Sequence, residues 1–185
     1  MLATKSLGVL LTLPTLASAQ LFAQASGYPN AQLLIETPEL AKLLSAPGVR
    51  VLDVRPAGEY SQEHIPGAVN LPALATDDLE ANRLGYPLTP ARAGELFRAA
   101  GVDTTSRVIL YDDHGGRLAA RVFYVLEFCG HRRVRVLNGG WKKWVGEGHP
   151  ITAAVPTVRA GSFKPAPDPR VIATAEWVAV HLKDP

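Results

Sequence analysis

Two apolar segments separated by a short loop form the clearest pattern in the chain. Residues 108–111, Val-Ile-Leu-Tyr, are β-branched, aliphatic or aromatic without interruption, which favours a strand covered on both faces in a parallel sheet. In residues 118–128 the apolar positions recur at helical spacing, while Arg121, Tyr124 and Glu127 form one narrow polar stripe. The pattern therefore predicts a central strand, a loop containing two glycines, and a mostly buried helix.

Similar units of strand and helix flank this segment on both sides. Strands are predicted at residues 33–35, at an edge of the sheet, at residues 49–54, between Pro66 and Pro72, and at residues 134–137. Helices are predicted to begin at Thr37 and Thr89, because each threonine is a potential hydroxyl cap followed by proline. Shorter helical stretches are predicted at residues 57–60 and 141–145. Residues 73–87 are predicted to be loop, with a solvated acidic patch of Asp77, Asp78 and Glu80.

The order of these elements predicts an α/β domain with a mostly parallel central sheet and helices on both sides, over residues 33–151. Residues 152–170 are rich in Ala, Pro and Thr and are predicted to be a linker. Residues 171–177 repeat the design of residues 34–40, with Ile, Thr and Glu identical at the same offset. We therefore interpret residues 171–185 as the truncated start of a second copy, and we expect the natural sequence to continue.

The first 25 residues belong to a different class from the rest. Lys5 precedes an apolar run at residues 7–13, a proline breaks the run, and Ala17-Ser18-Ala19 has the small residues of a cleavage site. We interpret residues 1–19 as a secretory signal peptide, with cleavage after residue 25 as the alternative, and expect a periplasmic or secreted protein. A spanning helix needs about 20 apolar residues, so no membrane association is expected after cleavage. A disordered tail or an uncleaved anchor is the alternative.

The charge and the cysteine content indicate which partners and which covalent links to expect. The formal net charge is +2 and no long run of Lys or Arg occurs, so no nucleic-acid partner is expected. The densest basic cluster, Arg132, Arg133 and Arg135, is interpreted as a solvated turn and strand end, with a local anion patch as the alternative. Cys129 is the only cysteine, so no internal disulfide can form. Its place at the end of the apolar helix predicts a buried core residue rather than a reactive thiol.

Candidate chemistry gathers in the loop between the central strand and the buried helix. Free backbone N–H groups and the helix dipole favour anions at this place, and open α/β sheets carry their sites there. The loop has no strong nucleophile; it consists of Asp112, Asp113, His114, Gly115, Gly116 and Arg117. Three consecutive polar residues rarely converge on one atom, so we favour side-chain turns that satisfy loop N–H groups. A metal site at these residues is the alternative, and no cofactor is expected.

Five motifs carry a family resemblance: Leu52-Asp53-Val54-Arg55, Glu59-Tyr60, His64-Ile65-Pro66-Gly67-Ala68-Val69-Asn70, Val108-Ile109-Leu110-Tyr111-Asp112 and Val136-Leu137-Asn138-Gly139-Gly140-Trp141. They occur in the order and spacing of the rhodanese family, so residues 33–151 resemble a three-layer rhodanese-like domain. With Gly130-His131 and Gly148-His149-Pro150, the pattern resembles the first domain of two-domain thiosulfate or 3-mercaptopyruvate sulfurtransferases. In that family a catalytic cysteine directly follows the strand in the second domain, and the first domain carries an acid there. Asp112 holds this position.

The resemblance implies a sulfurtransferase whose second-domain thiolate takes sulfane sulfur from thiosulfate or 3-mercaptopyruvate, becomes a persulfide and passes the sulfur to cyanide or a thiol. Its partners would be a second rhodanese-like domain of the same parent chain and a small anionic sulfur donor. A carboxylate is a poor sulfur acceptor, and at about 4 Å it would repel an anionic donor by roughly 1 kcal/mol in water and about 4 kcal/mol at a partly shielded dielectric. This chain alone is therefore predicted to be inactive. A complete, catalytically inactive binding or regulatory module is the alternative.

The remaining motif residues are assigned structural roles. Asp53 is predicted to accept hydrogen bonds that tie its strand to the turn around His64, because a bare buried carboxylate would be costly. Arg55 and Gly67 belong to the same structural motif, although Arg55 could instead line the approach to the loop. Gly139 and Gly140 are predicted to permit a tight turn and close packing, and Trp141 and Trp144 to lie in the core or at a domain interface.

Overall fold

The computed structural model describes residues 29–78 and 83–184 and divides the chain into two units, Met1–Ala31 and Gln32–Pro185. The signal-peptide prediction, for residues 1–19 or up to residue 25, lies outside the described residues, as does Glu80. The second unit contains the α/β domain that the pattern predicted. Within the described ranges, none of the helices combines the length and apolar character that a bilayer span requires.

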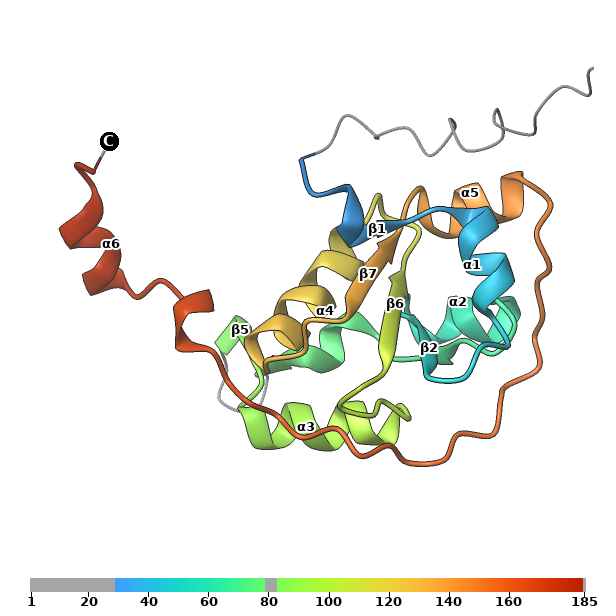
Figure 1. Ribbon diagram of the computed structural model, residues 1–185, viewed down its shortest axis with the longest axis horizontal. Helices are drawn as coiled ribbons and strands as arrows, with labels where there is room; N and C mark the ends of the chain where they lie inside the picture. The colour runs from blue at the N-terminus through green and yellow to red at the C-terminus, as the bar shows by residue number, and fades with distance from the viewer. Residues whose placement is uncertain (1–28, 79–82, 185) are drawn as a thin grey trace, which may run out of the picture. The chain divides into compact units, whose positions relative to one another are not determined.

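Strands and helices alternate along most of the chain (Figure 1). The strands are β1 Leu34–Ile35, β2 Val49–Asp53, β3 Val69–Asn70, β4 Asp77–Asp78, β5 Arg83–Pro87, β6 Arg107–Tyr111 and β7 Val134–Leu137. The helices are α1 Thr37–Leu43, α2 Ala57–Gln62, α3 Pro90–Ala99, α4 Arg117–Phe128, α5 Gly140–Gly146 and α6 Ala175–His181. Short 3-10 turns are η1 Ala31–Leu33, η2 Ala73–Thr76 and η3 Pro169–Val171.

The main sheet has the strand order β1-β7-β6-β2-β3, and all of its neighbouring strands pair in parallel. Its central strand, β6, is buried on both faces: Val108 and Leu110 enter one apolar cluster, whereas Ile109 and Tyr111 enter the other. The predicted central strand, the edge strand at β1 and the buried helix α4 are thereby confirmed. The alternation of side chains along a strand gives each cluster every second residue of β6.

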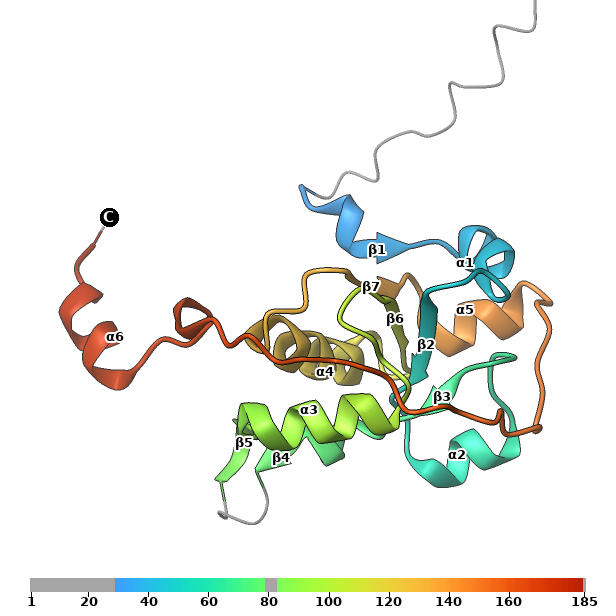
Figure 2. The ribbon, with the colours of Figure 1, turned by 60° about the horizontal axis from the view of Figure 1, so that its bottom comes forward.

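Helices cover both faces of this sheet, which gives three layers (Figures 1 and 2). The first cluster packs α3 and α4 against one face, with Phe97 and Leu126 fully buried. The second packs α1 and α5 against the other face, with Leu40 and Trp144 fully buried. Each fully buried side chain of this size contributes about 1.5–3 kcal/mol relative to an exposed one, so the two clusters hold the sheet rigidly beneath its loops.

The two predicted threonine caps have different outcomes. Thr89 is the N-cap of α3 and its hydroxyl accepts a hydrogen bond from the Arg92 N–H, as predicted. The prediction that Thr37 caps α1 is wrong. The N-cap is Glu36, the residue before it, and Thr37 is the first residue of α1. The Thr37 side chain is fully buried and donates its hydroxyl hydrogen to the Glu147 carboxylate. The Thr37 hydroxyl therefore donates to a distant carboxylate instead of accepting from an N–H group of the first helical turn.

The described parts of residues 73–87 are not the solvated loop that the pattern predicted. Residues 73–78 form η2 and β4, and residues 83–87 form β5, which pairs antiparallel with β4. Asp77 pairs with Arg121 of α4 at 2.5 Å, and Asp78 is buried. The correction has a physical reason: the arginine that neutralises Asp77 comes from a helix far along the sequence, so the local acidic pattern does not reveal it.

The segment of residues 152–168, which we call the strap, is extended but is attached to the domain rather than free. Its backbone donates to the carbonyl groups of α3, α4 and the residues that follow them: Gly161 N to Arg98 O at 2.8 Å, Phe163 N to Val102 O at 3.1 Å, Ala166 N to Cys129 O at 2.9 Å and Asp168 N to Phe128 O at 2.9 Å. Phe163 is buried in the first cluster. The ordered domain thus extends beyond residue 151, past the predicted domain boundary (Figure 2).

Close backbone approach makes this attachment possible. A Cβ added at Gly130 would lie 2.3 Å from the Ala166 carbonyl oxygen, and one at Gly161 would lie 2.0 Å from the Val102 carbonyl oxygen. Both distances are far below van der Waals contact, so only glycine fits where the strap meets the domain. The linker prediction rested on composition, which does not report such contacts.

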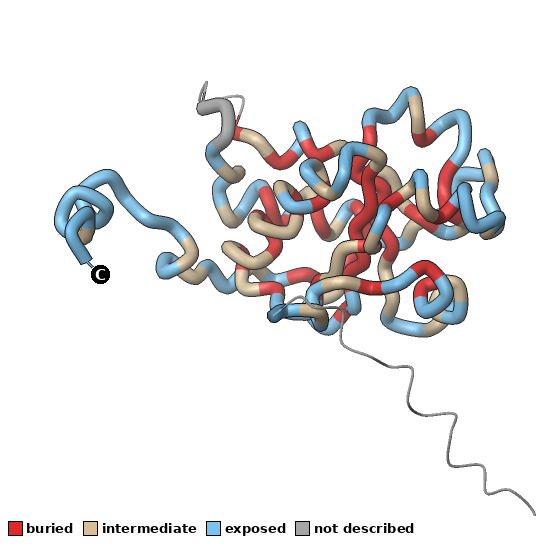
Figure 3. Tube along the Cα trace, turned by 90° about the horizontal axis from the view of Figure 1, so that it is seen from above, coloured by how far each residue is buried: buried red, intermediate tan, exposed pale blue. Residues whose placement is uncertain are grey.

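Residues 169–184 repeat part of the local structure of residues 31–44, namely a 3-10 turn followed by a short helix. η1 precedes β1 and α1 in the first segment, and η3 precedes α6 in the second. Thr174 caps α6 by accepting from the Trp177 N–H at 3.1 Å. The apolar side chains of α6 are exposed: Trp177 is 55 % and Val180 77 % exposed. Figure 3 shows most of this C-terminal segment in the colour of exposed residues. Leu40, which holds the place of Trp177 in the first segment, is fully buried.

Candidate functional site

The loop of residues 112–116 lies at the carboxyl end of β6, between that strand and α4. The turn between β7 and α5 approaches it closely: Trp141 N donates to the Asp112 carbonyl oxygen at 2.8 Å. A Cβ at Gly140 would lie 2.2 Å from the same oxygen, and Gly140 has φ +57°. The structure therefore shows close packing of Gly140 against the loop, and this packing fixes the start of the loop.

The Asp112 side chain accepts four hydrogen bonds from backbone N–H groups of the loop and of the first turn of α4. Its Oδ1 accepts from His114 N at 3.0 Å and Gly116 N at 2.8 Å, and its Oδ2 accepts from Leu118 N at 2.7 Å and Ala119 N at 2.9 Å. The residue is only 1 % exposed. Gly115 and Gly116 have φ of +69° and +88°, which turns the chain tightly enough for these N–H groups to converge.

Electrostatics explain why a carboxylate is stable in this position. The N–H groups of Leu118 and Ala119 belong to the first turn of α4, where no intrahelical acceptor exists. The positive end of the helix dipole also favours a negative charge here. The loop thus has the geometry of an anion site, and the protein's own carboxylate occupies it. A substrate anion would have to displace Asp112 to reach these donors.

Asp113 and His114 point away from this arrangement and form their own pair on the surface. His114 Nδ1 lies 2.5 Å from Asp113 Oδ1. Partial burial and the nearby carboxylate of Asp113 raise the pKa of Glu59. For Asp113 itself, partial burial acts to raise the pKa, but hydrogen bonding to His114, together with weaker interactions, lowers the pKa overall. The structure therefore brings Asp113 and His114 together with Glu59 but separates them from the inward-facing Asp112 carboxylate.

A buried polar network lies beneath the loop and holds β2 and β6 together. Arg55 Nη2 donates to Asp53 Oδ2 at 2.6 Å and to the Glu63 carbonyl oxygen at 2.8 Å. Tyr111 donates its hydroxyl hydrogen to Asp53 Oδ2 at 2.5 Å and accepts from Ile65 N at 3.1 Å. Burial opposes protonation of Arg55, but the hydrogen bond and charge of Asp53 raise its pKa overall. The Asp53 carboxylate therefore has partners that link its strand to the turn around His64.

His64 and Gly67 shape that turn. His64 is fully buried, with Nδ1 2.8 Å from the Tyr60 carbonyl oxygen and Nε2 3.1 Å from the Ala154 carbonyl oxygen. Its backbone also pairs with Thr152, at 2.8 and 2.9 Å. Gly67 has φ +78°, which the turn requires. His64 thereby joins the turn to the first residues of the strap, a contact that the sequence pattern did not indicate.

Tyr111 and Trp141 are the site residues whose roles sequence reasoning missed. The Arg55 guanidinium lies 4.2 Å from the centre of the Trp141 ring, and Trp141 stacks on Tyr111 with 6.2 Å between ring centres. Burial and the adjacent Asp53 charge raise the pKa of Tyr111 well above its usual range, so its hydroxyl remains a donor. A tyrosine immediately before a loop acid was the available signal for a buried hydroxyl at this point.

The loop of residues 112–116, which the structure describes in full, contains no cysteine or serine that could act as a nucleophile. Cys129 is buried at the end of α4, and burial raises its pKa to about 11, so the thiolate that attacks sulfur is scarce near neutral pH. The structure thus agrees with the prediction of a buried core cysteine. Among the residues that the structure describes, no three His, Cys, Asp or Glu side chains are arranged to hold a metal ion.

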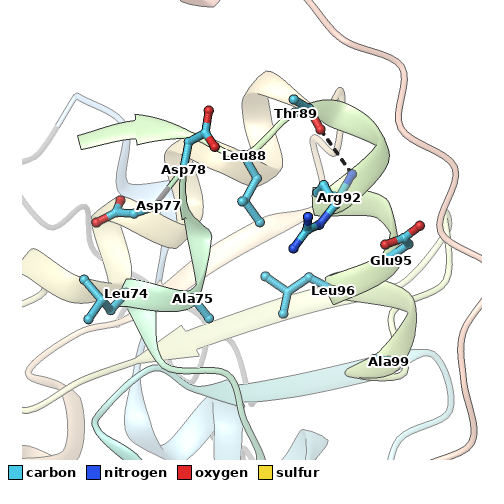
Figure 4. A pocket seen from close by; sticks show the side chains of 10 residues that line it. All are labelled: Leu74, Ala75, Asp77, Asp78, Leu88, Thr89, Arg92, Glu95, Leu96 and Ala99. Atoms are coloured by element: carbon cyan, nitrogen blue, oxygen red, sulfur yellow. Dashed lines mark hydrogen bonds between the residues drawn. The ribbon is translucent and has the colours of Figure 1, made fainter. Parts of the chain in front are cut away.

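Two hollows differ in their position relative to the loop. One of about 320 Å³ borders it and is lined by Gly115, Gly116, Gly139 and Gly140 together with Asn138 and apolar residues. Another, of about 680 Å³, lies between α3 and the β4–β5 hairpin, with Leu88 and Leu96 directed into it and Asp77 and Glu95 on its rim (Figure 4). None of the loop residues lines the larger hollow. Neither hollow adds a reactive group to the site.

Comparison with known proteins agrees with this geometry. Residues 36–147 match the model of the rhodanese-like domain family. A probable 3-mercaptopyruvate sulfurtransferase of Pseudomonas aeruginosa is 35 % identical over 170 residues, covering 84 % of this chain and 59 % of that protein. A thiosulfate sulfurtransferase of Azotobacter vinelandii is 31 % identical over 140 residues, covering 72 % of this chain and 49 % of that protein.

A solved structure shares the fold. The 3-mercaptopyruvate sulfotransferase SseA of Escherichia coli superposes with a TM-score of 0.75 at 23 % identity, covering 82 % of this chain and 62 % of SseA. The chain spans about half the length of the curated relatives it matches. The sequence match and the shared fold lead to one conclusion: this chain belongs to the family of rhodanese-like domains.

Proposed function

We propose that this chain is the non-catalytic first domain of an exported sulfurtransferase, which moves sulfane sulfur from thiosulfate or 3-mercaptopyruvate to cyanide or a thiol. In this proposal a cysteine of a second rhodanese-like domain carries the sulfur as a persulfide. With thiosulfate as donor, the thiolate attacks the sulfane sulfur, the sulfur–sulfur bond of thiosulfate breaks, and sulfite leaves with the bonding electrons. Cyanide or a thiolate then attacks the outer sulfur and regenerates the cysteine thiolate.

The position and hydrogen bonding of Asp112 carry the proposal. The residue stands directly after β6, where the family's catalytic cysteine stands in the active domain, and its carboxylate accepts four backbone N–H groups of the loop. A carboxylate in that place offers no thiolate, repels an anionic donor and occupies the donors that would bind it. The loop is therefore suited to holding its own structure rather than to catalysis.

A second domain is supported by the repeated local structure at the strap's end. The order of a 3-10 turn and a short helix, seen in η1 and α1, recurs in η3 and α6, and α6 leaves Trp177 and Val180 exposed. A helix of seven residues is marginal in water without packing. The sulfurtransferases that resemble this chain are about twice the length that it matches. We propose that a second rhodanese-like domain buries these side chains.

Export is proposed from the N-terminal sequence alone. The apolar run at residues 7–13 and the small residues Ala17-Ser18-Ala19 are typical of a signal peptide. The mature protein would then act in the periplasm or outside the cell.

Thiocyanate formation from thiosulfate and cyanide tests the proposal on three samples. We expect no turnover from this chain alone, turnover from the complete gene product, and loss of turnover when the cysteine after the central strand of the second domain is changed to serine. Turnover by this chain alone would contradict the proposal. A complete gene product with no second domain and no turnover would favour an inactive binding or regulatory module instead.

A further inference from the structure

A cavity of about 280 Å³ opens at the end of the sheet opposite the Asp112 loop. All strands of the main sheet run parallel, so the loop follows the carboxyl end of β6 and this cavity lies where β6 and β7 begin. Residues of η1, β1 and the end of α1 complete its walls. The volume is near the lower limit of about 300 Å³ for ligand pockets, so an occupant must be small.

The inner walls of the cavity are apolar. Ile35 and Ile109 are buried beneath it, and Leu43 closes one side. Leu33, which also lines the cavity, is 39 % exposed. Apolar surface of this kind favours an alkyl or aryl group over water, because its burial removes apolar area from solvent.

The rim of the cavity is positively charged, and strand alternation explains why. Ile109 pairs in register with Arg135. Arg107, on β6, and Arg133, the residue directly before β7, each lie two residues earlier, so they flank the same face of the sheet. Val108 N donates to the Arg133 carbonyl oxygen at 2.8 Å, which keeps the two strands in register up to this point. Like charges at facing positions of neighbouring strands are destabilising. A bound anion would reduce the repulsion between these two arginines.

The acids nearby neutralise other arginines of the cavity, not this pair. Arg135 pairs with Glu39 at 2.6 Å, and Arg132 pairs with Glu127 at 3.0 Å and Asp168 at 2.7 Å. In contrast, within residues 29–78 and 83–184 the Arg133 side chain donates to the Thr105 carbonyl oxygen and pairs with no acid. Among the described residues, the Arg107 side chain has no hydrogen-bond or ion-pair partner. The guanidinium groups of Arg107 and Arg133 are therefore not neutralised by a neighbouring acid of the described residues, and they lie at the rim of an apolar cavity.

We infer that this cavity binds a small amphipathic monoanion, an alkyl carboxylate of short chain, with its head group between Arg107 and Arg133 and its chain against Leu33, Ile35 and Leu43. The guanidinium groups offer paired N–H donors that match a carboxylate. The site is separate from the Asp112 loop and does not depend on the proposed sulfurtransferase activity.

Titration with hexanoate, monitored by the amide resonances of Val108 and Val134, tests the inference. We expect saturable binding of hexanoate, with sulfate and hexan-1-ol each at least about tenfold weaker, because one lacks the apolar chain and the other lacks the charge. Arg107→Gln and Arg133→Gln should each weaken hexanoate binding by about tenfold. Hexanoate affinity should also fall as salt concentration rises.

Arg159→Gln is the matched control, because Arg159 is exposed on the strap and does not line the cavity. It removes the same charge and should leave hexanoate binding unchanged. Thermal unfolding of each variant establishes that it is folded, and the comparison of hexanoate with hexan-1-ol on the unaltered chain does not depend on any variant. Absence of saturable hexanoate binding would overturn the inference. So would equal affinity for hexan-1-ol, or an unchanged affinity in both arginine variants.

Discussion

Replacement of Asp112 by alanine tests whether its carboxylate holds the loop together. The side chain accepts four backbone N–H groups, of which those of His114 and Gly116 lie in the loop and can bind water after the change. The N–H groups of Leu118 and Ala119 lie at the start of α4, and Ala119 is fully buried. Each hydrogen bond to a charged acceptor contributes about 1.5–3 kcal/mol. We therefore expect Asp112→Ala to lower the free energy of unfolding by about 3–5 kcal/mol.

Urea unfolding followed by tryptophan fluorescence measures this loss, because Trp141 donates to the Asp112 backbone and stacks on Tyr111. Asp113→Ala is the matched control: it removes a neighbouring carboxylate whose partner, His114, is exposed, and should cost less than about 1 kcal/mol. Asp112→Asn should fall between the two, because its amide oxygen still accepts while its N–H₂ group faces N–H donors. A loss below about 1 kcal/mol for Asp112→Ala, equal to that of Asp113→Ala, would refute the reasoning.

Three further predictions concern the strap, the cysteine and the turn beside the loop. Phe163→Ala should lower the free energy of unfolding by about 3–5 kcal/mol in urea unfolding, because Phe163 anchors the strap in the core; Val155→Ala, at a strap position 70 % exposed, should change it little. Cys129 should resist an aromatic disulfide reagent at pH 8 in the folded protein and react on unfolding. Because burial raises its pKa from 9.0 to about 11, its contribution to stability should be complete below pH 9 and decrease by about 2–3 kcal/mol as pH rises through 11. Gly140→Ala should destabilise the fold by more than Gly115→Ala, because only the former places a Cβ against the Asp112 carbonyl oxygen; equal losses in thermal unfolding would show that the close approach is unimportant.

Most of the main sheet could be predicted because its signals are local. The uninterrupted run at residues 108–111 identified a strand buried on both faces, and Thr89 with the following proline marked the start of α3. The same kind of local reasoning failed at Thr37, whose hydroxyl bonds to Glu147 from another part of the chain. It also failed for residues 73–87, where Arg121 neutralises Asp77.

The candidate site shows the same division. The position of Asp112 after the strand was visible in the sequence, and so was the tendency of loop acids to bind nearby N–H groups. The participation of Tyr111 in the Asp53 network was not, because it depends on how β2 and β6 pair. The attachment of the strap could not be predicted for a similar reason. In the sequence, Gly130 and Gly161 look like turn or linker residues, and only the structure shows that distant backbone segments pack against them.

Intact-mass measurement after incubation with thiosulfate tests the central claim most directly, because it detects sulfur transfer to this domain itself. The chain is incubated with excess thiosulfate, desalted and analysed by mass spectrometry without reductant. A second sample is treated with cyanide before the measurement. The account predicts an unchanged mass, since Asp112 replaces the nucleophile and Cys129 is buried. A mass increased by one sulfur atom and restored by cyanide would contradict the account and place a sulfur-carrying group in this domain.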